Sequence, residues 1–376
     1  MKPILLGIVL SLALVGCSEK QSGQSSSDQQ GAADVRAGQT LAQEQCAGCH
    51  GLDGKGTAPA IPHLAGQRVR YLLASLAEYK EGKRTHAALR DIAKQLTNAD
   101  ARNVTTFYSS LPPIPPVPTD GQVISPYERG KTVAAACAGC HGADGNSKSP
   151  RIPSLAGQQP RYFVAAIQEY LTGAREIAPM HALVRDMNRV DLEDVALYFA
   201  SQTPAERAGA AVGDAAAGEP LTAVCGGCHG YRGVSDDAAT PTLAAQDPQY
   251  LVGAIKAYRT TRKHLGMQRA VAALNDKDIE NIAAFYSAQK SKPAENGQRL
   301  VQDLTDKCGR CHNGNVDNPS LAIPNIAAQD RDYLVMALRA YRDDRRQSSV
   351  MHVMSLPYSD SVIESIASYY ASQPAR

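Results

Sequence analysis

The chain has 376 residues, and its 39 basic and 37 acidic side chains leave a formal net charge of +2. This balance provides no strong basic field, so the composition argues against a nucleic-acid-binding protein. Tyrosine dominates the aromatic residues, with 16 Tyr against 4 Phe and no Trp. The nine cysteines carry more information about function than any other residue type.

The N-terminus has the pattern of an export signal. A short basic start, Met1-Lys2, precedes an apolar run from Ile4 to Val15, and Gly16 stands just before Cys17. This combination is typical of a secretory signal, and the apolar run is too short for a transmembrane span. We therefore expect residues 1–17 to be a signal peptide and the protein to be exported.

The end of this signal resembles a bacterial lipobox, Leu14-Val15-Gly16-Cys17, in which the cysteine is lipidated and becomes the first mature residue. The resemblance implies that Cys17 anchors the chain to a membrane, and Ser18 after it indicates the outer membrane of a Gram-negative bacterium. An ordinary cleaved signal with an unmodified cysteine is the alternative, but a free exposed thiol is a liability in an exported protein. Residues 18–33 are rich in Ser, Gln and Gly, which predicts a flexible tether.

Four copies of Cys-x-x-Cys-His follow the tether, at residues 46–50, 137–141, 225–229 and 308–312. In this motif two thiols add across the vinyl groups of a haem, and the adjacent histidine ligates the iron. A zinc site would need two motifs to converge, and it would leave the histidine of each motif unexplained. We therefore predict four covalently bound haem c groups. The attaching cysteines are Cys46, Cys49, Cys137, Cys140, Cys225, Cys228, Cys308 and Cys311, and the proximal iron ligands are His50, His141, His229 and His312.

Each motif belongs to a longer repeat. A Pro-containing segment follows it, ending in Ala-Gly-Gln in the first two copies and in Ala-Ala-Gln in the last two. An amphipathic helix then begins and ends at a tyrosine in every copy, at 71–79, 162–170, 250–258 and 333–341. The final helix ends in paired aromatics, and a glycine precedes each motif: Gly38, Gly130, Gly218 and Gly297. We expect this glycine to let the first helix cross closely over the last one.

These features resemble class I cytochrome c domains, and in particular the two-domain dihaem cytochrome c4 family. The run Cys-Ala-Gly-Cys-His-Gly-Ala-Asp-Gly-Asn at 137–146 and the Leu-Ala-Gly-Gln segments carry the resemblance, which covers residues 34–376 as two tandem pairs. It implies an all-α fold of four tandem class I cytochrome c domains, each a small helical domain wrapped around one covalent haem c. The buried haem supplies much of the apolar core that a unit of this size lacks.

Shifts in composition indicate the domain boundaries. We expect domain 1 at 34–111, a Pro-rich linker at 112–124, domain 2 at 125–203, domain 3 at 204–290 and domain 4 at 291–376. The linker has five prolines among residues 112–118, which is typical of a stiff polyproline spacer. A ligand for a proline-binding module is the alternative. Short or stiff linkers keep the domains close together, as electron transfer requires.

The distal iron ligand distinguishes the repeats. The family uses methionine there, and a thioether raises the potential of the haem. When the repeats are aligned on their C-terminal aromatics, Met180, Met267 and Met351 share one column at the family's ligand position, so the resemblance implies that they bind iron. Met354 competes with Met351 in domain 4, and Met187 falls in another column, which indicates packing.

Domain 1 departs from this pattern, because Leu89 occupies the methionine column and no methionine lies between residues 2 and 179. His86 lies one helical turn before Leu89 and is the distal ligand that we predict. His63 and an open, five-coordinate iron are the alternatives. His264 shares the column of His86 in domain 3, which has its own methionine, so a histidine there does not have to bind iron.

Four arginines follow the second helix of the repeats: Arg84, Arg175, Arg262 and Arg345. A guanidinium group matches the geometry of a carboxylate, so these side chains are candidates to bind haem propionates. Solvated surface charges are the alternative.

Two classes of function fit these features. We predict a membrane-tethered tetrahaem cytochrome that relays electrons between periplasmic or membrane redox partners and is not an enzyme. The alternatives are the cytochrome subunit of a dehydrogenase or reductase complex, and an enzyme with an open catalytic haem in domain 1. The chain has no flavin, quinone or molybdenum signature and no Gly-x-Gly-x-x-Gly. Three methionine-ligated haems without a substrate pocket favour the relay.

Overall fold

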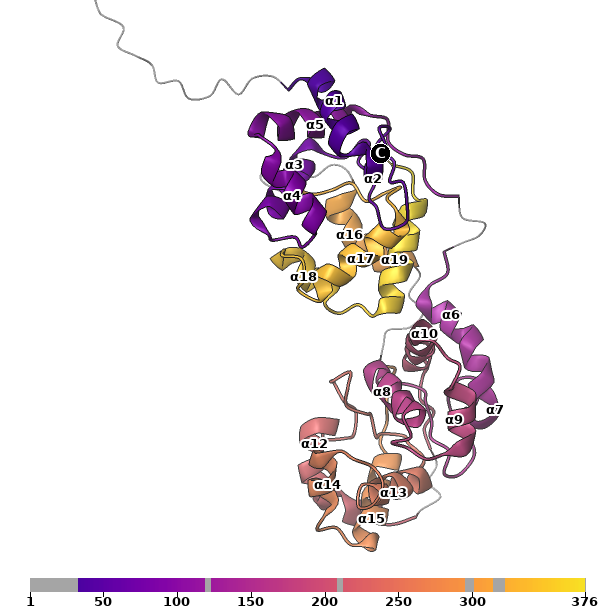
Figure 1. The fold of residues 1–376 in the computed structure, drawn as a ribbon. Coiled ribbons are helices and arrows are strands. Elements are labelled where there is room, and N and C mark those ends of the chain that lie inside the picture. The colour runs from indigo at the N-terminus through magenta and orange to yellow at the C-terminus, as the bar shows by residue number, and fades with distance from the viewer. Residues whose placement is uncertain (1–32, 119–122, 208–211, 295–300, 314–321, 376) are drawn as a thin grey trace, which may run out of the picture.

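The computed structural model describes residues 33–118, 123–207, 212–294, 301–313 and 322–375, and every regular element in these ranges is a helix (Figure 1). The expected all-α fold is therefore confirmed. The predicted signal peptide with Cys17 and almost all of the tether lie outside the described residues, as does Gly297. No helix within the described ranges is long and apolar enough to cross a membrane.

The helices form four groups with one common plan, and we keep the names domain 1 to domain 4 for them. In each group the motif lies at the end of a helix, and a long helix, a short helix and a long final helix follow (Figure 1). Domain 1 contains α1 (Val35–Gln45), α2 (Ala47–His50), α3 (Val69–Glu81), α4 (Ala87–Gln95) and α5 (Asn98–Ser110). Domain 2 contains α6 (Pro126–Ala134), α7 (Ala138–His141), α8 (Pro160–Leu171), α9 (Ala178–Val184) and α10 (Arg189–Ala200). Domain 3 contains α11 (Ala215–Gly218), α12 (Ala223–His229), α13 (Pro248–Ala257), α14 (Leu265–Val271) and α15 (Asp276–Ser287), and domain 4 contains α16 (Val301–His312), α17 (Arg331–Arg342), α18 (Ser349–Ser355) and α19 (Asp360–Ser372).

Side-chain caps determine where the final helices begin. The Thr97 hydroxyl accepts a hydrogen bond from the N–H of Asp100, and the Asp100 carboxylate accepts one from the N–H of Thr97. Asn275 and Asp278 repeat this capping box at the start of α15. Such a box satisfies two of the N–H groups that the first turn of a helix leaves unpaired. Short sequence patterns therefore fix these helix starts.

The first and last helices of a domain cross at a glycine. A Cβ atom built on Gly38 of α1 would lie 2.1 Å from the carbonyl oxygen of Asn103 in α5. A Cβ atom built on Gly130 or Gly218 would also lie 2.1 Å from a carbonyl oxygen, of α10 and α15 respectively. Only a hydrogen atom fits in this space, so the predicted close crossing is confirmed in domains 1 to 3.

The domains pair out of chain order: domain 1 packs against domain 4, and domain 2 packs against domain 3 (Figure 1). In the first pair the Gln67 side chain donates to the carbonyl of Asn325 at 2.8 Å and accepts from its N–H at 2.8 Å. Gln329 makes the reciprocal bonds with the backbone of His63, at 3.0 and 2.7 Å. Each glutamine therefore satisfies both backbone polar groups of one residue in the opposite domain.

The second pair repeats this contact. Gln158 bonds both backbone groups of Thr242, at 3.1 and 2.9 Å, and Gln246 bonds those of Ser154, at 2.9 and 2.7 Å. The four glutamines are at most 8% exposed. The protein thus consists of two equivalent units, which we call the outer unit (domains 1 and 4) and the inner unit (domains 2 and 3).

The four domains follow one another in tandem along the chain as expected, but this nesting corrects which of them pair. Two paired units are present, but the first domain is paired with the last one. The reason lies in the linker, since a stretch with five prolines among residues 112–118 stays extended. It cannot reverse its direction and bring domain 2 against domain 1. It passes the end of α19 instead, where the N–H of Val117 donates to the carbonyl of Ala371 at 3.2 Å. The linker therefore leads from domain 1 past domain 4 to domain 2.

The loops that carry the four interface glutamines, which we call the pairing loops, explain the change from Ala-Gly-Gln to Ala-Ala-Gln. Gly66 and Gly157 adopt left-handed φ values of 64° and 65°, and a Cβ atom on them would lie 2.8 Å from Pro113 and 2.5 Å from Pro204, the prolines that follow the last helix of each domain. Ala245 and Ala328 occupy the equivalent positions of domains 3 and 4 with φ values of 57° and 54°. An alanine accepts this backbone at a cost of about 1–2 kcal/mol, so the same loop forms in all four domains.

We expect Gly38→Ala to destabilise domain 1 by about 1–3 kcal/mol, because the added methyl group forces α1 away from α5. Gly253→Ala is the matched control, since a Cβ atom on Gly253 in α13 would meet no atom within 4 Å. The control should lose no stability and gain up to about 1 kcal/mol from helix propensity. Thermal unfolding followed by circular dichroism measures both variants, and equal melting temperatures would contradict the close crossing.

Candidate functional site

Each Cys-x-x-Cys-His motif occupies the end of a helix. Its first cysteine is half-buried and its second is exposed in all four domains, and these eight thiols are free of disulfide bonds. In the first three domains a glycine with positive φ follows the histidine and ends the helix, as Gly51 does at 63°. Residues three and four positions apart lie on one face of a helix. Both thiols and the imidazole can therefore reach one flat group on the same side.

One hydrogen bond holds the proximal histidine in every domain. Nδ1 lies 2.8–3.0 Å from a proline carbonyl oxygen in the pairs His50–Pro62, His141–Pro153, His229–Pro241 and His312–Pro324. A carbonyl can only accept, so Nδ1 carries the hydrogen and Nε2 keeps its lone pair. Burial lowers the pKa of all four imidazoles, and the proline carbonyl only partly offsets this. A neutral imidazole with a free Nε2 is the form that binds iron.

The surroundings of the motifs fit a haem. Burial raises the pKa of the Cys46 thiol to about 11 and raises the pKa of Cys137, Cys225 and Cys308 as well. An uncharged thioether suits such a site better than a thiolate. Arg346 gives a second indication that a haem fits here, because its Nε is buried without a hydrogen-bond partner among the described residues. A haem propionate is an acceptor that would satisfy it.

Arg346, and not Arg345, is the buried arginine of domain 4. The Arg345 side chain is 59% exposed, whereas Arg346 is 8% exposed and its backbone bridges to that of Arg84 across the outer unit. Arg346 also donates to the hydroxyls of Tyr71 and Tyr333, at 2.9 and 3.4 Å. Sequence reasoning missed it by one position. Arg346 lies five residues after the tyrosine that ends its long helix, as Arg84 does, and this spacing could have found it.

The residues that align at the distal ligand position, which we call the distal column, lie on four short helices. The third residues of α4, α9, α14 and α18 are Leu89, Met180, Met267 and Met351. The column that the sequence alignment defined is therefore one structural position. Met354 lies one turn further along α18, and Met180 and Met187 both contact the apolar core of domain 2.

His86 lies beside this column and caps its helix. Its Nδ1 accepts a hydrogen bond from the N–H of Leu89 at 3.3 Å at the start of α4. His264 caps α14 in the same way at 3.2 Å, and the hydroxyl of Ser348 caps α18 at 3.3 Å. A neutral imidazole whose Nδ1 accepts carries its hydrogen on Nε2. His86 can therefore bind iron through Nε2 only after its ring releases the helix cap.

His63 belongs to the contact between domains. Its backbone bonds Gln329 of domain 4, and its Nδ1 accepts from the N–H of Gly56 at 3.0 Å. It also follows Pro62, whose carbonyl holds His50. The structure thus places His63 next to the residue that holds the proximal histidine of domain 1.

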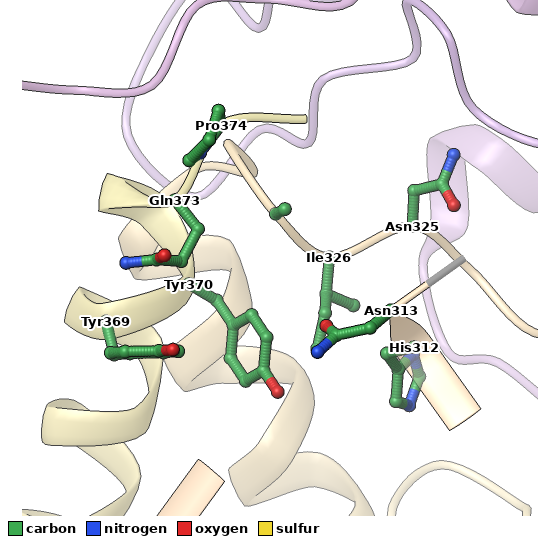
Figure 2. A pocket seen from close by; sticks show the side chains of 9 residues that line it. His312, Asn313, Asn325, Ile326, Tyr369, Tyr370, Gln373 and Pro374 are labelled. Atoms are coloured by element: carbon green, nitrogen blue, oxygen red, sulfur yellow. The ribbon is translucent and has the colours of Figure 1, made fainter. Parts of the chain in front are cut away.

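A hollow lies beside the proximal histidine of domain 4. Figure 2 shows His312, Ile326 and Tyr370 around it, contributed by the end of α16, the loop after Pro324 and α19. Tyr369 and Gln373 also line it, and no residue of the distal helix α18 does. The hollow therefore lies on the side of the proximal histidine.

Comparisons with known proteins agree on one family. A family model described as cytochrome c matches residues 35–111 and 127–202. Cytochrome c4 of Pseudomonas aeruginosa is 36% identical over 173 residues, which cover 42% of this chain and 85% of that protein. A thiosulfate dehydrogenase electron acceptor of Thiomonas intermedia is 31% identical over 172 residues, which cover 42% of this chain and 78% of that protein.

Among solved structures, reduced recombinant cytochrome c4 from Pseudomonas stutzeri has 31% sequence identity and a TM-score of 0.41. The match covers 43% of this chain and 98% of that one. The thiosulfate dehydrogenase TsdBA of Marichromatium purpuratum has 22% identity and a TM-score of 0.40, and the match covers 66% of this chain and 67% of that one.

Mass spectrometry under denaturing conditions should find four covalent haem groups on each chain. Replacing both cysteines of one motif by serine, as in Cys225→Ser with Cys228→Ser, should remove the mass of one haem, because each domain attaches its own group. Replacing the exposed Thr172 by serine is the control and should leave all four. A mass that fits intact thiols or bound zinc would contradict the haem assignment.

Proposed function

Because the chain belongs to the cytochrome c family, as a relative of the dihaem cytochrome c4 proteins, we propose that it is a membrane-tethered tetrahaem relay on the periplasmic side of the cell envelope. Its four covalent haem c groups make it an electron-transfer protein. The observation that carries the proposal is the repetition of one proximal site in four directly packed domains. Four haem domains packed in succession suit the transfer of electrons over a distance that one haem cannot span.

An oxidoreductase is the partner that we propose as electron donor. One of the relatives is named as the electron acceptor of a dehydrogenase, which supports a partner of this class. The charge of the chain is nearly balanced, so the docking surface has to be local and not a property of the whole molecule. A role as the cytochrome subunit of a dehydrogenase or reductase complex is the closely related alternative.

We propose Met180, Met267 and Met351 as the distal ligands of domains 2 to 4, and His86 as the ligand of domain 1. Their common position on the short helices supports the three methionines. The place of His86 supports the histidine, because it caps the helix that carries the ligand position and lies one turn before Leu89. Ligation by His86 requires its ring to turn away from the N–H of Leu89, which water can then satisfy.

An open site in domain 1 is the second candidate, and the helix cap made by His86 favours it. With the ring engaged by Leu89, the only side chain at the ligand position is a leucine, which has no donor atom. Domain 1 would then bind and activate a small ligand, with the other domains supplying or removing electrons. Spin state separates this candidate from the relay with a six-coordinate iron in every domain.

The membrane anchor is tested by Cys17→Ser. Since this change removes the proposed lipidation site, we expect a soluble protein that still carries four haems. Fractionation of cells followed by haem staining measures the location, and Ser18→Ala is the control that should stay in the membrane fraction. Retention of Cys17→Ser in salt-washed membranes would assign the anchoring to another segment.

The distal ligand of domain 1 is tested by His86→Ser, which removes the imidazole but keeps a hydroxyl cap of the kind that Ser348 provides. We expect the wild-type haem 1 to titrate below the methionine-ligated haems by on the order of a few hundred millivolts, because imidazole stabilises ferrous iron less than a thioether does. The variant should convert haem 1 alone to high spin. Electron paramagnetic resonance and a redox titration measure both effects.

His264→Ser is the matched control, because His264 caps α14 in a domain that has Met267. It should leave all four haems low-spin. Adding Leu89→Met to His86→Ser should raise the potential of haem 1 towards that of the others. Four low-spin haems and an unchanged titration in His86→Ser would rule out His86, and a high-spin haem already present in the wild type would favour the open site.

A further inference from the structure

The two units meet at a third contact, which is different from the pairing within each unit. It brings α6 and α10 of domain 2 against α19 of domain 4 (Figure 1). The apolar core of domain 4 continues across it, since Tyr127 and Leu197 of domain 2 pack into the cluster that contains Val362 and Ile366. A core shared between two domains holds them in a fixed orientation, in contrast to the polar contacts of mobile domains.

A buried ionic cluster lies at the centre of this contact. Arg129 binds both carboxylate oxygens of Asp194, at 2.8 and 3.0 Å, and donates to the hydroxyls of Ser361 and Ser365 on α19, at 3.0 and 2.9 Å. The N–H of Ser361 donates to Glu193 at 2.9 Å. Asp194, Ser361 and Ser365 are at most 1% exposed. The Arg129 side chain is 32% exposed, and its bonds to both domains can form only in one register of the two units.

The three contacts place the domains in one spatial row. Domain 1 meets domain 4 through the glutamine contacts, domain 4 meets domain 2 through α19, and domain 2 meets domain 3 through the second set of glutamine contacts. Figure 1 shows domain 1 and domain 3 at opposite ends of this row. Neighbours in the row are therefore 1–4–2–3, although the chain order is 1–2–3–4.

We propose that electrons travel along this spatial row, so that domain 4 is the obligatory intermediate between domain 1 and the inner unit, and that Arg129, Asp194 and Ser361 are positioning residues for the step between units. The inference rests on the proposed relay function and deepens it. The rate of electron tunnelling falls steeply with distance, so each electron moves to the spatial neighbour. In each step the donor domain loses one electron and the acceptor domain gains one, and no bond forms or breaks.

The test injects electrons at domain 1 and counts how many leave it. In the Cys17→Ser background, Gln39→Cys on the exposed face of α1 provides a thiol for a ruthenium photosensitiser. A train of flashes with a sacrificial reductant loads electrons. The charge-transfer band of ferric iron bound to methionine reports their arrival in domains 2, 3 and 4, because domain 1 has Leu89 in place of a methionine. In the otherwise unchanged protein three electrons should bleach this band rapidly.

Removal of single haems distinguishes electron transfer in the spatial order 1–4–2–3 from transfer in the chain order 1–2–3–4. Without haem 4, in Cys308→Ser with Cys311→Ser, the rapid bleaching should fall from three electrons to none. Without haem 2, in Cys137→Ser with Cys140→Ser, one electron should still arrive rapidly, in domain 4. Sequential transfer in chain order gives the opposite result, two electrons without haem 4 and none without haem 2, and would overturn the proposal.

A second variant keeps all four haems. Ser361→Glu places a carboxylate against Glu193 and Asp194, and should separate the units while leaving the outer unit paired. The rapid phase should fall from three electrons to one, and small-angle scattering should show a longer particle. Ser368→Glu is the matched control on α19, because its carboxylate lies beside Arg331 within domain 4, and should keep all three electrons.

The experiment distinguishes a wrong order of electron transfer from a wrong relay function. If the protein with all four haems shows no rapid bleaching at all, the relay function itself is wrong. If it takes up three electrons and Ser361→Glu also takes up three while its units are separated, the contact at α19 is not the path. Both outcomes are measured on the full chain.

Discussion

The reciprocal bonds between interface glutamines and the opposite backbone determine how the rest of the molecule is arranged. Each of these buried side chains satisfies an N–H and a carbonyl that would otherwise lie unpaired between two domains. The contact therefore specifies register and orientation as well as holding the domains together. Since it is the same in both units, the chain contains two copies of one dihaem arrangement, and the linkers decide which domains take part in each copy.

The linker between domains 1 and 2 makes the outer unit. Its prolines keep it extended past the end of α19, and the close fit of Pro113 over Gly66 holds its start against domain 1. Domain 2 is thereby carried past domain 4, and the last domain of the chain fills the place beside the first. Domain 1, which has leucine at the ligand position, lies at one end of the row (Figure 1). An atypical site at an end can control entry or exit of electrons without interrupting the row.

Small local changes adapt one backbone plan to different roles. The distal helix is capped by His86, His264 or Ser348 with the same geometry, so the cap can change while the ligand position stays fixed. The left-handed residue of the pairing loop is glycine where a linker crosses it and alanine in domains 3 and 4. The backbone thus tolerates substitutions that alter iron chemistry, because the helix crossing and the proximal hydrogen bond do not depend on them.

The sequence by itself determined the local chemistry of this protein. The spacing of two cysteines and a histidine within one helical turn, the glycine at the helix crossing and the caps at Thr97 and Asn275 are all local patterns, and their structural consequences follow from backbone geometry. The methionine column could also be aligned, because each repeat preserves the order of its helices. Arg346 was missed by one residue, although it follows Tyr341 at the same spacing as Arg84 follows Tyr79.

Only the tertiary structure decided how the domains pair. The loops narrow the choice, because each unit combines an Ala-Gly-Gln loop with an Ala-Ala-Gln loop, whose following carboxylate, Asp330 or Asp247, accepts a hydrogen bond from the backbone of the opposite domain. Domains 3 and 4 carry the same loop, so this pattern leaves both as partners for domain 1. The choice depends on the path of a stiff linker and on the cluster of Arg129, Asp194 and Ser361, whose members lie far apart in the chain. The role of His86 also depends on local structure. While its Nδ1 accepts from the N–H of Leu89, its Nε2 carries the hydrogen, and only after the ring turns away can Nε2 bind iron.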